Sequence, residues 1–175
     1  MTRLYLALQF LPLAVFVAVA RKNGFTPEAW SIAFQSSAIF AFIETVLLVI
    51  AKKPLNRLLM GANLFLAIGG IAFLLELDTV LAFYGQMMET TLFLAVVIVG
   101  LVSTFFTSRG FIEVADRQPQ DIRRYSQYLL VITATCTVVS VIFRGNVLLA
   151  GTVPFVALIV ARKLLQTKLQ RRTVQ

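Results

Sequence analysis

Histidine is absent from this chain, and cysteine occurs once, at Cys136. Without histidine, neither a Ser-His-Asp or Cys-His catalytic arrangement nor a histidine-ligated metal is available. A lone cysteine excludes a disulfide within the chain and a cluster of thiolate metal ligands. The sequence also lacks a glycine loop of the G-x-x-x-x-G-K type, which binds phosphates in nucleotide-binding proteins. We therefore expect a protein that is not an enzyme and that uses no cofactor and no metal.

Charged residues are scarce as well, at 14% of the 175 residues, whereas 59% are hydrophobic. So few polar residues cannot cover the surface of a soluble domain of this length. A helix needs roughly 20 apolar residues to cross the hydrocarbon core of a bilayer, and six runs approach that length. The composition predicts an all-α, polytopic integral membrane protein, a six-transmembrane-helix bundle that forms a single transmembrane domain.

The ends of the predicted helices follow the flanking residues. Thr26-Pro27-Glu28 is typical of a helix start, with an N-cap threonine, a proline at the first helical position and an acidic first turn. Pro12 predicts a kink in the first helix. The polar stretch 76–86 predicts a connection along the membrane interface. We expect helices at about 4–20, 27–51, 58–75, 90–107, 125–143 and 146–161, and a basic cytoplasmic tail over 162–175.

The basic residues indicate how the chain crosses the membrane. With six crossings, one side carries 13 of the 16 lysines and arginines, and the other side carries only Arg21, Lys22 and Arg144. Cytoplasmic segments are enriched in these residues, so both termini are expected in the cytoplasm. The net charge of +8 lies at the ends of apolar runs and in the tail. We therefore expect partners in the bilayer, namely anionic lipid headgroups at the cytoplasmic face, and no nucleic acid.

One ionisable residue, Glu44, lies well inside a predicted span. A charge at the centre of a transmembrane helix costs roughly 2.5–3.5 kcal/mol, so such a residue usually faces the bundle and has a partner or a role. Ala33, Ser37, Ala41 and Glu44 recur at helical spacing, which predicts one face of small residues suited to close helix packing.

Asn63, Gln9, Ser103 and Thr104 are expected at a similar depth to Glu44, in the cytoplasmic half of the bundle. The candidate residues are Glu44, Asn63, Gln9, Ser37, Ser103 and Thr104. They have two interpretations that the sequence leaves open. They line a pocket for a substrate or an ion, or they form interhelical hydrogen bonds that fix the packing of the bundle.

Two segments resemble a known family. Gln9-Phe10-Leu11-Pro12-Leu13-Ala14-Val15-Phe16 is similar to the F-L-P-L-x-x-F start of the intracellular septation protein A family, small inner-membrane proteins of Gram-negative bacteria. Gly69-Gly70-Ile71-Ala72-Phe73-Leu74-Leu75, followed by Asp78 and Phe83, resembles the third helix and the acidic, aromatic turn of that family. The chain departs from the family at 84–89, where the family has a segment with lysine and tryptophan.

The resemblance implies a multi-pass protein of the bacterial inner membrane with a structural or interaction role in envelope maintenance or septation. Its expected partners are other inner-membrane proteins, and it brings no catalytic residues. The alternative function is a small transporter or channel in which Glu44 binds a proton, a cation or a polar substrate. A homodimer is also left open, because Gly61 and Gly69-Gly70 permit close helix packing.

Overall fold

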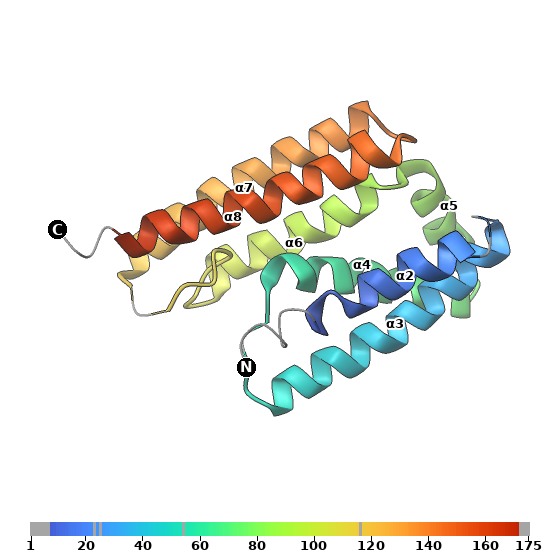
Figure 1. The fold of residues 1–175 in the computed structure, drawn as a ribbon, viewed down its shortest axis with the longest axis horizontal. Coiled ribbons are helices and arrows are strands. Elements are labelled where there is room, and N and C mark those ends of the chain that lie inside the picture. The colour runs from blue at the N-terminus through green and yellow to red at the C-terminus, as the bar shows by residue number, and fades with distance from the viewer. Residues whose placement is uncertain (1–7, 23, 25, 54, 116, 172–175) are drawn as a thin grey trace. The chain divides into compact units, whose positions relative to one another are not determined.

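The computed structural model describes residues 8–22, 24, 26–53, 55–115 and 117–171, and within them it contains helices and no strand (Figure 1). The chain divides into two compact units, Met1–Gln86 and Met87–Gln175. The predicted all-α class is confirmed for the described residues. The single transmembrane domain stays a prediction.

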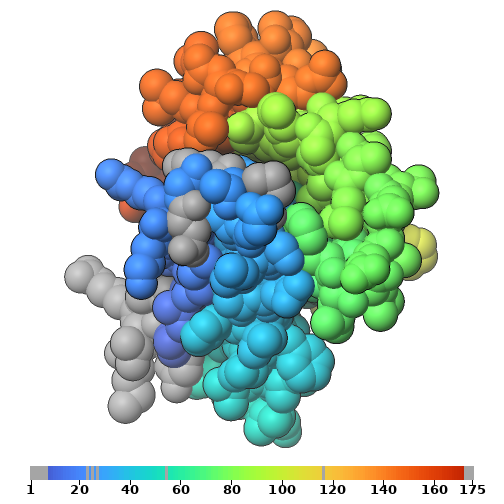
Figure 2. Space-filling model, turned by 90° about the vertical axis from the view of Figure 1, so that its right-hand side faces the viewer, coloured from blue at the N-terminus to red at the C-terminus, as the bar shows by residue number. Residues whose placement is uncertain are grey.

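The first unit is built around one long central helix. Its elements are α2 (Leu11–Lys22), α3 (Pro27–Ile50), α4 (Arg57–Leu74) and α5 (Asp78–Met87). Helix α3 packs against both α2 and α4, and the surfaces of α2 (blue) and α3 (lighter blue to cyan) meet directly in the space-filling view (Figure 2). Helices α3 and α4 are consecutive, antiparallel and joined by a short connection, and their polar faces are buried against each other.

Local sequence signals explain where α3 and α4 begin. The Thr26 hydroxyl accepts a hydrogen bond from the backbone N–H of Ala29 at 3.2 Å, which satisfies one of the unpaired donors at the start of α3. The Asn56 side chain accepts from the N–H of Leu58 at 3.1 Å and caps α4 in the same way. The predicted start of the second helix at Pro27 is confirmed.

Helices α3 and α4 approach each other closely at Gly69 and Gly70. A Cβ atom at Gly70 would lie 2.5 Å from the Cβ of Ala38, and one at Gly69 would lie 2.4 Å from the ring of Phe34. Beside this contact, an aromatic cluster fills the unit: the ring of Phe34 lies 4.7 Å from that of Phe16 and 5.3 Å from that of Phe65. Gly69-Gly70 thus serves packing within the chain, because its small face is covered by α3.

The second unit contains α6 (Thr90–Phe106), α7 (Pro119–Ile142), a π-helical turn η1 (Val147–Thr152) and α8 (Val153–Arg171). Helix α7 packs against both α6 and α8, and the three run side by side in Figure 1. Cys136 is buried on α7, in agreement with a packing role. The C-terminal end of α6, the N-terminal end of α7 and the C-terminal end of α8 therefore lie at the same end of this unit.

Four predicted boundaries are corrected. The first helix extends to Lys22, after a turn at Phe10 just before Pro12, while residues 4–7 lie outside the described residues. The predicted interfacial connection 76–86 is largely the helix α5. Helix α7 begins at Pro119, six residues before the predicted span 125–143.

The fourth correction concerns the end of the chain, where α8 continues through Arg162 to Arg171. The described part of the predicted tail is therefore helical. Its Leu, Lys, Gln and Arg residues are good helix formers, and Leu169 is buried. The change from apolar to charged residues at Arg162 therefore ends the apolar run, whereas the helix itself continues to Arg171.

Four described helical segments are long and apolar enough to cross a membrane: Glu28–Ile50, Arg57–Leu74, Pro119–Ile142 and Val147–Arg171. A fifth candidate would combine α5 and α6, which are separated by a break at Met88-Glu89. Large apolar side chains on these helices remain exposed, among them Phe42 at 71% and Ile50 at 73%. Contiguous exposed apolar faces of this kind are unfavourable in water and suit contact with lipid.

Candidate functional site

The predicted intramembrane carboxyl group lies between α3 and α4. Glu44 is buried, and its Oε2 accepts a hydrogen bond of 2.9 Å from Nδ2 of Asn63. The two residues are 19 positions apart, and the hydrogen bond joins neighbouring antiparallel helices. The sequence placed both residues at one depth, and the structure brings their side chains into contact.

The face of α3 that carries Glu44 is the buried one. Ala33, Ser37 and Ala41 are each at most 2% exposed, as their spacing predicts. Ser37 lies two helical turns before Glu44 on this face, and its buried hydroxyl has no hydrogen-bond partner among the described residues. A buried polar group of this kind is uncommon and marks a position where a further polar group would be stabilised.

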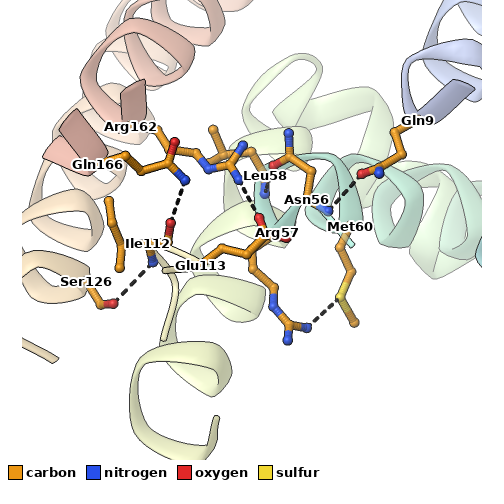
Figure 3. Close-up of polar contacts among 10 residues, drawn as sticks. All are labelled: Gln9, Asn56, Arg57, Leu58, Met60, Ile112, Glu113, Ser126, Arg162 and Gln166. Atoms are coloured by element: carbon orange, nitrogen blue, oxygen red, sulfur yellow. Dashed lines mark hydrogen bonds and ion pairs between the residues drawn. The ribbon is translucent and has the colours of Figure 1, made fainter. Parts of the chain in front are cut away.

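Gln9 does not join Glu44 and Asn63. Its side-chain oxygen accepts a hydrogen bond of 2.7 Å from the backbone N–H of Asn56, the N-cap residue of α4 (Figure 3). This contact ties the turn before α2 to the start of α4, so Gln9 has a capping and packing role in the first unit. The expected depth of Gln9 in the membrane could not predict this hydrogen bond. Its partner is a backbone N–H, which the pattern of side chains in the sequence does not indicate.

Ser103 and Thr104 belong to α6, in the second unit. Both are buried, and the Thr104 hydroxyl donates to the carbonyl oxygen of Gly100 at 2.7 Å within its own helix. Such a back-bond satisfies a hydroxyl inside an apolar helix without a partner helix. A pocket that these two residues share with Glu44 stays a prediction.

A second polar group, which the sequence did not indicate, lies at one end of the second unit (Figure 3). Glu113, in the connection between α6 and α7, forms an ion pair with Arg162 of α8, and both side chains are largely buried. Nε2 of Gln166 donates to the carbonyl oxygen of Ile112 at 2.8 Å, one turn further along α8. These contacts attach the connection to the C-terminal half of α8.

The same connection is attached to α7. The N–H of Ile112 donates to Oγ of Ser126 at 3.2 Å. Gly110 has a φ of +61°, and a Cβ there would lie 2.3 Å from that same oxygen, so the close approach requires glycine. The pairing of Glu113 with Arg162 had no local signal, because the two residues are 49 positions apart.

The chemistry available to these groups is limited to hydrogen bonding, ion pairing and proton exchange. Within the described part of the chain, no group of three or more Cys, Asp or Glu side chains is placed to hold a metal ion. Glu44 and Asn63 offer a carboxyl and an amide that hydrogen-bond each other. Glu113 and Arg162 offer a buried pair of opposite charges.

Comparisons with protein-family models, with curated proteins and with solved structures found no match to this chain. The resemblance to the septation family therefore depends on the residues quoted above.

Proposed function

We propose that the chain is a six-span protein of the bacterial inner membrane with both termini in the cytoplasm. The six crossings are α2, α3, α4, α6, α7 and η1 with α8, while α5 lies along the interface. Helix α6 has 17 residues, about 26 Å at 1.5 Å per residue, which is close to the roughly 30 Å hydrocarbon core. The alternation of basic residues supports an even number of crossings.

Cysteine labelling tests this topology. In a Cys136→Ser background, Lys22→Cys should react with a membrane-impermeant maleimide added to spheroplasts, because the α2–α3 turn lies outside the cytoplasm. Gln118→Cys, before α7, should react only after the cells are lysed. A reporter fused after Gln175 should be active only in the cytoplasm. Protection of Lys22→Cys from external reagent would remove α2 from the set of crossings.

Within that membrane, we propose a non-enzymatic structural or interaction role in envelope maintenance or septation, exerted through contacts with other inner-membrane proteins. The observation that carries this proposal is the use of polar groups between the helices of the first unit. Glu44 bonds Asn63, and Gln9 bonds the backbone of Asn56. Interhelical hydrogen bonds of this kind fix helix packing, each by roughly 0.6–1.7 kcal/mol.

The apolar faces of the long helices support the same proposal. Helix α3 exposes large apolar side chains along its length, and so do α7 and α8. Such faces can contact lipid tails or the helices of partner proteins in the membrane. The partners expected from the resemblance are other inner-membrane proteins, or a second copy of this chain.

The test is complementation by Glu44→Gln in cells where deletion of the gene has an envelope or growth phenotype. Glutamine retains an oxygen that accepts from Asn63 but cannot ionise. We expect full complementation at a normal protein level. Asn63→Ala, the matched variant, removes the donor and should lower the level of folded protein. Loss of function by Glu44→Gln at a normal level would contradict the structural role.

A small transporter or channel is the second candidate function. The buried Ser37 hydroxyl, without a partner among the described residues and on the same face as Glu44, favours it. In this function, a proton, a cation or a polar substrate would bind between Ser37 and Glu44. Loss of function in Glu44→Gln, together with pH-dependent substrate uptake by the unsubstituted protein in liposomes, is the result that this candidate requires.

A further inference from the structure

The connection between α6 and α7 leaves a polar cavity beside the C-terminal half of α8. The cavity has a volume of about 420 Å³ and is lined by Glu113, Val114, Ala115, Arg117, Gln166 and Gln170. Cavities of roughly 300–1,000 Å³ are typical of small-molecule sites. The volume is therefore sufficient for a phosphate-bearing headgroup.

The walls of this cavity are held in place by contacts around it. Glu113 is paired with Arg162, and the Gln166 amide donates to the carbonyl oxygen of Ile112. Nη2 of Arg117 donates to the carbonyl oxygen of Gln170 at 3.2 Å, which links the connection to the last turn of α8. Because these groups are already ordered, a ligand would bind without the entropy cost of arranging them.

The end of the unit that holds the cavity carries more basic than acidic residues. Among its described lining residues, Glu113 and Arg117 are charged, and Arg162 balances Glu113. Asp121 is a further acid at this end of the unit, and Asp116 lies outside the described residues. The basic residues at the same end are Arg109, Arg123, Arg124, Lys163, Lys168 and Arg171. Their combined potential favours an anion in the cavity.

The position along α8 corresponds to the level of lipid headgroups. The segment Val147–Arg171 has 25 residues, about 37 Å in length, and so exceeds the roughly 30 Å core of a bilayer. Its uninterrupted apolar run ends at Ala161, before Arg162-Lys163, and after Leu164-Leu165 the residues from Gln166 are mostly polar. Basic pockets between transmembrane helices on the cytoplasmic side are typical binding sites for phospholipid headgroups.

We propose that this cavity binds a phosphate group, with Arg117 as its principal ligand. A guanidinium has five N–H donors, so it can hold the Gln170 carbonyl and still form a bidentate pair with two phosphate oxygens. The phosphate is carried by an anionic phospholipid or by a free phosphate compound. A phospholipid as the carrier of the phosphate rests on the proposed membrane topology, whereas phosphate binding in the cavity does not depend on that topology.

Binding to the purified, delipidated full-length chain in neutral detergent tests the proposal. The probes are a fluorescent phosphatidylglycerol, phosphatidylcholine as a neutral-headgroup control, and inorganic phosphate as a competitor. Arg117→Gln should weaken phosphatidylglycerol binding roughly tenfold, because hydrogen bonds to charged groups are lost. Arg117→Lys retains the charge but not the two parallel donors. Its affinity for phosphatidylglycerol should therefore lie between those of Arg117→Gln and the unsubstituted chain.

Lys163→Gln is the matched control, because Lys163 is exposed at the same end of the unit and does not line the cavity. It should change affinity less than about twofold, since exposed charges are screened. Competition by inorganic phosphate at millimolar concentration would identify a free phosphate compound, and its failure to compete would identify the lipid. Equal losses in Arg117→Gln and Lys163→Gln, or no binding of either phosphate probe, would overturn the proposal. Complementation by Glu44→Gln is independent of all these outcomes.

Discussion

Replacing Gly70 by alanine tests the close contact between α3 and α4. An ideal Cβ at this position would lie 2.5 Å from the Cβ of Ala38 and 3.0 Å from the carbonyl oxygen of Phe34. Neither atom is the end of a flexible side chain, so the new methyl group can be accommodated only if the two helices move apart. The hydrogen bond between Glu44 and Asn63 spans the same pair of helices and would be lengthened.

The expected magnitude is the difference between two effects. Overpacking a well-packed interior costs about 1–3 kcal/mol. Alanine is favoured over glycine in a helix by up to about 1 kcal/mol, which offsets part of that cost. We expect Gly70→Ala to lower the free energy of unfolding by about 1–2 kcal/mol. Gly85→Ala is the matched control, because a Cβ at Gly85 in α5 meets nothing within 4 Å and should stabilise the unit slightly.

The assay is unfolding of the purified chain in mixed micelles by increasing amounts of SDS. Trp30 is the only tryptophan, and its ring lies 5.6 Å from that of Phe16 and 6.4 Å from that of Phe34. Its fluorescence therefore reports the packing of the first unit, where both glycines lie. The unfolding midpoint should fall for Gly70→Ala and rise for Gly85→Ala.

A second-site change separates the steric cause from other effects. Ala38→Gly removes the atom that lies 2.5 Å from the new methyl group. In a double-mutant cycle, Ala38→Gly should recover at least half of the free energy of unfolding that Gly70→Ala loses. The reason is that substitutions at residues in contact do not have additive effects. A midpoint that rises in Gly70→Ala as it does in Gly85→Ala, or a cycle without coupling, would refute the close packing of α3 and α4.

Two further predictions concern the buried ion pair of the second unit and the N-cap of α3. Glu113→Ala leaves Arg162 without its carboxylate, and breaking a buried ion pair costs about 3–5 kcal/mol, so the thermal midpoint of the chain should fall strongly. The double variant Glu113→Gln and Arg162→Gln should recover much of this loss, and equal midpoints for single and double variants would contradict a pair. Thr26→Ala removes the acceptor for the N–H of Ala29 and should cost about 0.5–2 kcal/mol in the SDS assay. Thr26→Ser retains the hydroxyl and should remain close to the unsubstituted chain, and a large loss in Thr26→Ser would argue against capping.

Part of the candidate site could be predicted because helix periodicity is a local property. The spacing of Ala33, Ser37, Ala41 and Glu44 placed them on one face, and the structure buries that face. The sequence could predict only that Glu44 and Asn63 lie at a similar depth. It could not predict their contact, because the rotation of α4 about its axis depends on packing at Gly69-Gly70. The pocket that would join them to Ser103 and Thr104 stays a prediction.

The sequence by itself determined where apolar helices occur and where several of them begin. The start of α3 follows from Thr26 and Pro27, since capping and proline geometry act within one turn of the chain. The positions of the basic residues likewise predict the orientation in the membrane without any knowledge of packing. These inferences can be made from the sequence because each depends on residues close together in the chain, and the orientation stays a prediction.

Only the tertiary structure decided which distant groups meet. Glu113 lies between two predicted helices and Arg162 in the predicted basic tail, whereas the fold pairs them across 49 positions. Helix α8, which continues to Arg171, carries Arg162 of this pair and the buried Leu169. A charged side chain marks the end of an apolar run, but its partner is set by the packing of helices far apart in the chain.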